Sequence, residues 1–226
     1  MDTSSARGSA ALVDKERVVD EIVSETPSSF SRTLLDMIDS ILSRQGLDFQ
    51  PLGCGALGGI SVTTGPGSFT GIRIGIATVQ GITLSTGVPV FGVSTLDAMA
   101  RALGRPEFAG PATALIDAGK GNAYFADFEF ADGKPFRISP DGFAPIKDLV
   151  ERAEKRAFFC DKGDLSRLQT HVTVEFAVLK NSAAAGAAIR AYELTASGEA
   201  GDVALLASNY VQKSYAERSL NHFQEG

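Results

Sequence analysis

Residues Thr63 to Ala77 read TTGPGSFTGIRIGIA, an apolar strand end followed by a glycine-rich turn and the start of an apolar helix. Glycines and hydroxyl side chains in such a turn are typical of loops that hold phosphate. A P-loop reads GxxxxGK[ST], but Gly67 and Gly71 have a different spacing and no lysine follows them. A dinucleotide-binding turn reads GxGxxG, and Thr70 stands where its third glycine belongs. Neither nucleotide motif is matched.

The same residues have a structural interpretation. The motif turn comprises Gly65, Pro66, Gly67, Ser68, Phe69, Thr70 and Gly71. Pro66 fixes φ, its flanking glycines allow a tight strand-to-helix turn, and Ser68 is a suitable helix cap. Gly71 and Gly75 share one helix face, which lets another backbone approach closely. The turn is therefore predicted to shape a helix start, and an anion at that N-terminus stays an open alternative.

Strand and helix patterns alternate on both sides of this turn. Upstream, the sequence predicts strands over 10–13 and 17–23, joined at Asp14-Lys15, and a helix that Ser28, Ser29 or Ser31 caps and Gly46 ends. Around the turn, it predicts a strand in GGISVTTG, a helix over Phe69–Thr86, a strand in PVFGVST, and a helix over Thr95–Leu103 capped by Ser94 or Thr95. From Ile60 to Leu96 the one charged residue is Arg73, which indicates a sheet covered on both faces.

The composition changes after the segment GRPEFAGP, which gives the best boundary between domains. Residues 1–103 are predicted to form a lobe that carries the motif turn, and residues 104–226 a smaller C-terminal α/β lobe. The second lobe begins with antiparallel strands that turn at 119–121 and 132–133. It later contains the alanine-rich helix SAAAGAAIRAYELT.

Two predicted helices carry more apolar surface than one sheet requires. Apolar residues of the first helix spread over about 160°, whereas packing on a sheet needs little more than about 100°. The second helix is apolar on two sides, with Ile74, Ala77 and Leu84 opposite its main stripe. The surplus indicates either deep burial within the chain or a partner surface. We expect the helices to lie side by side and, with two from a partner, to form a four-helix bundle. The predicted partner contacts are drawn from Leu34, Met37, Ile38, Ile41, Ile72, Ile76, Val79 and Thr83, and only part of each stripe is expected at the interface because some of these residues must face the chain's own sheet.

Composition narrows the class of protein. The 226 residues are 44% apolar and 21% charged, as in a globular protein, and the net charge of −6 argues against an autonomous nucleic-acid binder. Cys54 and Cys160 lie far apart, and His171 and His222 form no metal-ligand motif. No apolar run is long enough to span a membrane and no leader precedes the first polar residues, so a cytoplasmic protein is expected.

The segments GPGSFTGIRIGIATVQG and GVPVFGVSTLDAMA resemble the signature of the bacterial TsaB (YeaZ) family, which belongs to the ASKHA superfamily. Asp2-Thr3-Ser4, ALIDAGKGNAYF and Asn209-Tyr210-Val211 resemble its other motifs. The resemblance implies an α/β, ribonuclease-H-like fold of two mixed-sheet lobes flanked by helices. The family places a strand before its DTS motif, whereas this chain begins MDTS. Either preceding residues are missing, or the strand is absent and the sheet edge is weakened. Gly119 and Gln212 replace arginines of the family pattern.

The resemblance also implies a function. The chain is expected to be a non-catalytic scaffold in the complex that forms N6-threonylcarbamoyladenosine on tRNA, and to bind and activate a TsaD-type transferase through the paired helices. A TsaE-type ATPase is an expected third partner, and a homodimer is expected when the transferase is absent. The tRNA is expected to bind only through the complex, and ATP and metal only on partner subunits. The alternatives are an ASKHA-type small-molecule kinase, with Asp2 as its Mg²⁺ ligand, or an M22 glycoprotease-like protein.

Overall fold

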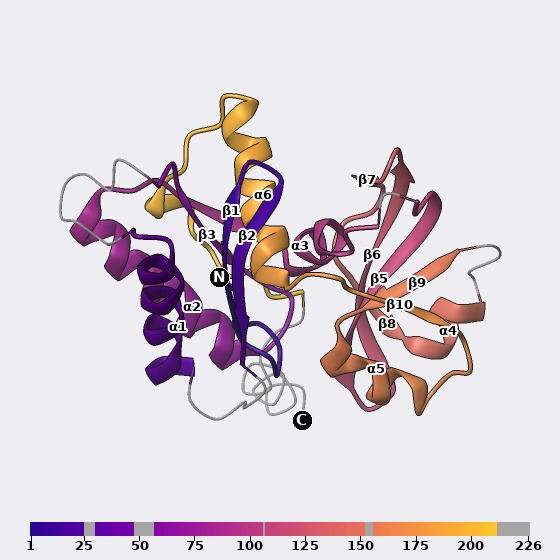
Figure 1. Ribbon diagram of the computed structural model, residues 1–226. Helices are drawn as coiled ribbons and strands as arrows, with labels where there is room; N and C mark the ends of the chain where they lie inside the picture. The colour runs from indigo at the N-terminus through magenta and orange to yellow at the C-terminus, as the bar shows by residue number, and fades with distance from the viewer. Residues whose placement is uncertain (25–29, 48–56, 106, 152–155, 212–226) are drawn as a thin grey trace, which may run out of the picture.

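The computed structural model describes residues 1–24, 30–47, 57–105, 107–151 and 156–211 (Figure 1). The first lobe contains β1 (Ser9–Asp14), β2 (Arg17–Val23), α1 (Phe30–Arg44), β3 (Ile60–Thr63), α2 (Phe69–Thr86), β4 (Val90–Val93) and α3 (Thr95–Ala102). Along the chain there follow β5 (Gly110–Gly119), β6 (Asn122–Ala131), β7 (Lys134–Arg137), β8 (Gly142–Pro145), α4 (Ile146–Glu151), β9 (Ala157–Cys160), α5 (Lys162–Gln169), β10 (Phe176–Val178), α6 (Ala183–Ala196) and η1 (Val203–Leu205). The predicted cap positions Ser28 and Ser29 lie outside the described residues, and the side chain of Ser31 is not described either.

The first two residues complete the sheet of the first lobe. Strands β1 and β2 form an antiparallel hairpin, and β3 and β4 pair in parallel. Asp2 bridges to Ser9 of β1, while the Met1 nitrogen donates to the Ser61 oxygen (2.7 Å) and the Thr63 nitrogen donates to the Met1 oxygen (3.2 Å). The order is therefore β2–β1–Met1/Asp2–β3–β4. Met1 and Asp2 thus occupy a central position between β1 and β3 rather than an edge, and both alternatives for the missing strand stay predictions.

The sheet of the second lobe has the same order. Its strands run β7–β6–β5–β9–β10, antiparallel from β7 to β5 and parallel from β5 to β10, with β8 paired to the far end of β6. The β5–β6 and β6–β7 turns fall where the sequence predicted them, with Lys120 and Asp132 at φ of 54° and 52°. Both lobes have the predicted ribonuclease-H-like architecture.

Helices cover both faces of the first sheet. On one face α1 and α2 lie side by side, as predicted, and share one core in which Leu34, Ile41 and Val79 pack with Val62. Helix α6 covers the other face (Figure 1). Neighbouring residues of β1 show this alternation, because Ala10 packs in the α1 core whereas the Ser9 hydroxyl accepts from the Ala184 nitrogen of α6 (3.3 Å).

The lobes exchange helices. Helix α3 of the first lobe buries Leu96, Met99 and Leu103 against the second sheet, whereas α6 packs on the first sheet. The two helices also cross closely, since a Cβ on Gly186 would lie 1.9 Å from the Ala98 oxygen. The boundary expected between residues 103 and 104 falls between α3 and β5. It stays a prediction, because each side of it supplies a helix to the sheet of the other.

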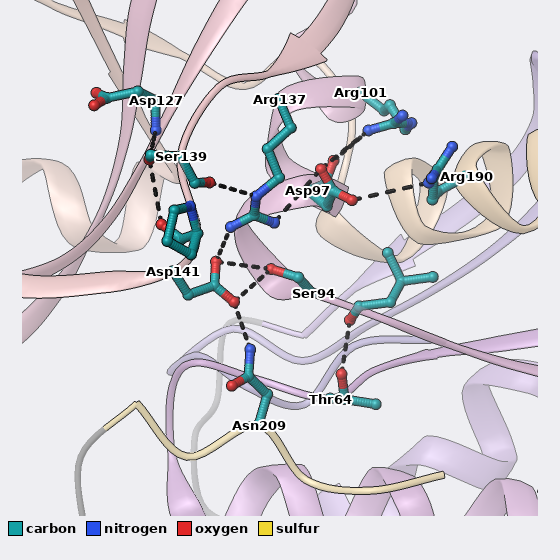
Figure 2. Close-up of polar contacts among 12 residues, drawn as sticks. Thr64, Ser94, Asp97, Arg101, Asp127, Arg137, Ser139, Asp141, Arg190 and Asn209 are labelled. Atoms are coloured by element: carbon teal, nitrogen blue, oxygen red, sulfur yellow. Dashed lines mark hydrogen bonds and ion pairs between the residues drawn. The ribbon is translucent and has the colours of Figure 1, made fainter. Parts of the chain in front are cut away.

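Charged side chains surround the junction of the lobes (Figure 2). Asp97 of α3 lies 3.4 Å from Arg101, 3.7 Å from Arg137 of β7 and 3.8 Å from Arg190 of α6. Glu193 accepts from Arg101 (2.9 Å) and Arg190 (3.0 Å). Burial raises the pKa of Glu193, but the hydrogen bonds and charges of the two arginines outweigh burial and hold the pKa below its ordinary value. The junction is therefore an ion-pair network rather than a single contact.

Candidate functional site

The motif turn wraps the first residues of the chain. A Cβ on Gly67 would lie 2.2 Å from the Ser4 oxygen, and a Cβ on Gly71 would lie 1.8 Å from the Thr3 oxygen. The Ser68 nitrogen donates to the Ser4 oxygen (2.6 Å), and the Ser68 hydroxyl accepts from the Gly71 nitrogen (3.2 Å). The predicted cap is confirmed, and so is the close backbone approach, which comes from the chain's own Thr3 and Ser4.

The carboxylate of Asp2 stabilises the contact between the first residues and the motif turn. It is buried, and its Oδ1 accepts from the Ser4 nitrogen (2.9 Å), the Ser4 hydroxyl and the Thr63 hydroxyl (2.6 Å). A buried carboxylate requires such donors, because its charge has left water. Asp2 therefore connects the first residues to β3 and the motif turn, which is a structural task.

A cleft of about 560 Å³ opens beside the start of α2, between the lobes. Ser5, Ser68 and Thr70 line it from the first lobe, and Asp117, Tyr124, Asp164 and Arg167 line it from the second. Arg167 pairs with Asp117 at 3.5 Å. The described lining thus brings two carboxyl groups and one guanidinium to the side of the cleft formed by the second lobe.

Asp164 is the most perturbed carboxyl of this cleft. Burial, together with the negative charges of Asp161 and Asp117, raises its pKa to about 7 against the opposing charge of Arg167. The neighbouring thiol of Cys160 is buried, and burial together with Asp164 and Asp161 raises its pKa to about 12. Cys160 is therefore an unreactive thiol of the core.

Most of the predicted partner contacts belong to the core of this chain. Six of them expose less than a tenth of their surface: Leu34, Met37, Ile38, Ile41, Ile72 and Val79. For these six the interface prediction needs correction, because a side chain packed inside its own lobe has no area left for a partner. Ile76 and Thr83 are half-buried and stay predictions. The helical wheel showed two apolar sides of α2, but not which side faces the sheet.

The opposite side of α2 is exposed. Arg73, Ala77, Gly81 and Leu84 follow one another at helical spacing, and Leu84 exposes 80% of its surface. We call these four residues the α2 ridge. On α1, Leu35 is also 52% exposed. The signal was present in the sequence, since Ala77 and Leu84 fall opposite the buried stripe.

An aromatic cluster stands at the start of the α2 ridge. The rings of Phe69 and Tyr210 stack with centroids 4.7 Å apart, and the Arg73 guanidinium lies 3.9 Å from the Phe69 centroid. The Arg73 Nε also donates to the Tyr210 hydroxyl at 3.1 Å. All three side chains reach solvent. Tyrosine and arginine are enriched among the residues that dominate binding energy at protein interfaces.

In the described part of the chain, no group of three or more His, Cys, Asp or Glu side chains is arranged to hold a metal ion. Among the same residues, no helix combines the length and apolar character needed to cross a membrane. Cys54, His222 and Gln212 lie outside the described residues.

Comparisons with known proteins agree on one family. The family described as "TsaD: tRNA N6-adenosine threonylcarbamoyltransferase" matches residues 19–222. A relative from Escherichia coli (strain K12), named tRNA threonylcarbamoyladenosine biosynthesis protein TsaB, is 38% identical over 46% of this chain and 42% of its own. Proteins of the same name from Haemophilus influenzae and Bacillus subtilis are 34% and 28% identical over 56% and 69% of this chain, and 51% and 65% of theirs. The chain thus spans about half the length of the curated relatives it matches.

A solved structure supports the fold. The crystal structure of a Pseudomonas aeruginosa protein with similarity to peptidase YEAZ superposes with a TM-score of 0.72, at 24% identity, over 93% of this chain and 97% of that one. The motif turn, the paired ribonuclease-H-like lobes and the family match agree with one another. The chain belongs to the family described as TsaD: tRNA N6-adenosine threonylcarbamoyltransferase, and the curated relatives it resembles within that family are TsaB proteins.

Proposed function

We propose that the chain is a non-catalytic subunit of the complex that forms threonylcarbamoyladenosine on tRNA. In this role it binds and activates a TsaD-type transferase through the outer sides of α1 and α2. The names of the curated relatives support the pathway. The observation that carries the proposal is the α2 ridge, where Leu84 is 80% exposed on a helix whose one charged residue is Arg73.

The α2 ridge is suited to helix–helix contact. Ala77 and Gly81 are small, so a partner helix can approach the α2 backbone closely, while Leu84 supplies an apolar knob beside them. On α1, Leu35 is a second exposed leucine. Paired helices from two subunits would then form the four-helix bundle expected from the sequence, with the outer residues rather than the buried stripe at its centre.

The chemistry of the complex is assigned to the partners under this proposal. ATP and metal are bound by the transferase and a TsaE-type ATPase, and the tRNA is held through the complex. Two features of this chain support the assignment. Asp2, the candidate metal ligand of a kinase, is engaged by Ser4 and Thr63. The net charge of −6 also suits a subunit that leaves most tRNA contacts to others.

The test is the affinity for the TsaD-type transferase of the same organism. Leu84→Glu is expected to weaken this affinity tenfold or more (about 1.4 kcal/mol or greater), because a carboxylate replaces an apolar anchor. Ile138→Glu, which changes a 55% exposed isoleucine just after β7 in the second lobe, is the matched control and is expected to bind like the unmodified chain. Equal weakening by both variants, or by neither, contradicts the proposed surface. A transferase that does not bind the unmodified chain contradicts the function.

A further inference from the structure

The last described segment of the chain runs against the motif turn. The Asn209 nitrogen donates to the Thr64 oxygen at 2.7 Å. The Asn209 oxygen fills the space that a side chain at Gly65 would need, since a Cβ there would lie 2.5 Å from it. The segment Ala207–Tyr210 is therefore fitted to the first lobe by its backbone.

The side chain of Asn209 reaches the second lobe (Figure 2). Its Nδ2 donates to a carboxylate oxygen of Asp141, in the connection between β7 and β8. The same carboxylate accepts from the Ser94 hydroxyl (3.1 Å) and pairs with Arg137. Only 8% of the Asp141 side chain is exposed. A charge this buried depends on its donors, so each donor contributes to holding the carboxylate in place.

At Ser94, the hydrogen bond to Asp141 replaces the usual capping bond of a helix. It stands at the N-cap position of α3, where a serine hydroxyl ordinarily accepts from the first turn of the helix. The Ser94 side chain makes no such cap bond and donates to Asp141 instead. The start of α3, the β7–β8 connection and the C-terminal segment are thus joined at one carboxylate.

We propose that the segment Ala207–Tyr210 is a clasp that fixes the relative orientation of the lobes and presents Tyr210 to a protein partner. Asn209 supplies the connection between lobes through Asp141, and the next residue, Tyr210, packs on Phe69 and Arg73 at the start of the α2 ridge. The partner arm of this inference rests on the proposed function. The inference also gives a role to Asn209-Tyr210-Val211, the closing motif that the partner surface alone does not explain.

The clasp predicts that the Asn209–Asp141 contact is coupled to partner binding at Phe69, Arg73 and Tyr210. A partner seated on Phe69, Arg73 and Tyr210 holds the segment down and so stabilises the Asn209–Asp141 contact. By thermodynamic linkage, loss of that contact weakens the affinity for the partner by the same factor.

The lobe arm of the test uses the free chain. Spin labels on the exposed positions Asp39 of α1 and Ser166 of α5 report the distance between lobes. Cys54 is replaced by serine in all samples, while Cys160 is buried and unreactive. Asn209→Ala and Asp141→Asn are expected to broaden the distance distribution. Glu16→Gln is the control, because the Glu16–Lys134 pair (3.5 Å) also connects the lobes but both side chains are more than half exposed.

The partner arm measures the Kd for the TsaD-type transferase. Asn209→Ala is expected to raise it roughly tenfold, as loss of a hydrogen bond to a charged group predicts. Tyr210→Phe keeps the ring stack and is expected to weaken binding less. Unchanged distance distributions in folded Asn209→Ala and Asp141→Asn overturn the clasp. Broadened distributions with an unchanged Kd overturn the coupling to the partner. If the unmodified chain binds no transferase, the proposed function fails, while the distance measurement still decides whether the clasp exists.

Discussion

At the scale of single residues, Gly71 carries a strict steric requirement. A Cβ there would lie 1.8 Å from the Thr3 oxygen, a backbone atom that does not move without displacing the first residues of the sheet. Gly71→Ala is expected to destabilise the chain by about 3 kcal/mol, measured by urea unfolding, because overpacking strains both backbones.

The matched control lies in the same helix. A Cβ on Gly81 meets nothing within 4 Å, and the residue is exposed. Gly81→Ala is expected to stabilise the free chain by roughly 0.5–1 kcal/mol through helix propensity. Opposite effects of Gly71→Ala and Gly81→Ala on the free energy of unfolding would distinguish steric overpacking from helix propensity. Equal effects would show that Thr3 does not constrain the turn.

Asp164 determines a pH dependence. Its pKa is about 7 in the folded chain, whereas the ordinary value is 3.8. Between these values the unfolded chain has lost the proton that the folded chain still holds, so stability falls as pH rises from about 4 to about 7. Asp164→Asn removes this loss. It is expected to leave stability unchanged near pH 4 and to raise it by about 2 kcal/mol at pH 8, less than the full shift at about 1.4 kcal/mol per pKa unit, because the site relaxes around the charge.

Thermal unfolding from pH 4 to 8 checks this expectation. Asp161→Asn is a useful comparison, since Asp161 caps α5 through the Gly163 nitrogen (2.7 Å) and contributes a charge that raises the pKa of Asp164. It is expected to keep the cap, because an asparagine side-chain oxygen accepts the same hydrogen bond, and to reduce the loss of stability with rising pH, because it removes a charge that raises the pKa of Asp164. A pH profile of Asp164→Asn parallel to that of the unmodified chain would show that Asp164 ionises normally.

At the scale of elements, α1 separates core from surface within two residues. Met37 exposes 7% of its surface and Leu35 exposes 52%. Met37→Glu places a carboxylate in the core shared by α1 and α2 and is expected to cost several kcal/mol. Leu35→Glu is expected to change the free energy of unfolding by less than about 0.5 kcal/mol. Urea unfolding of the free chain distinguishes the two. If Met37→Glu were folded and as stable as the unmodified chain, Met37 would not be a core residue, and the buried stripe of α1 would again be a candidate for the partner interface.

At the scale of the whole molecule, the exchange of α3 and α6 joins the lobes through their cores. Each helix follows a lobe in sequence and packs on the sheet of the other lobe. Asp97, Arg101 and Arg190 connect the same two helices by charge (Figure 2). The clasp at Asp141 adds a contact on the side of the motif turn. The relative orientation of the lobes therefore depends on contacts between residues far apart in the sequence, including those of Ser94 and Asn209 with Asp141.

The sequence by itself determined the elements around the motif turn. Helix α2 begins and ends where it was expected, because Ser68 caps its start and Gly87, at φ of 71°, ends it. The hairpin turns follow from Gly119 and Gly121 and from the pair Asp132-Gly133, since glycine and aspartate tolerate the positive φ that these turns require. The motif residues also carried the resemblance that identified the family. All of these features depend on neighbours a few positions apart, which a sequence displays directly.

Only the tertiary structure decided which apolar side of α2 is buried. Ile72 and Val79 have the same hydrophobic character as Leu84, and their burial depends on where α1 and β3 lie. The same holds for Met1 and Asp2, two residues too short to read as a strand, which become central because Ser9 and Ser61 flank them. Asn209 and Asp141 meet although they are 68 positions apart. Contacts at such separations depend on the packing of complete sheets and helices, and no local pattern encodes them.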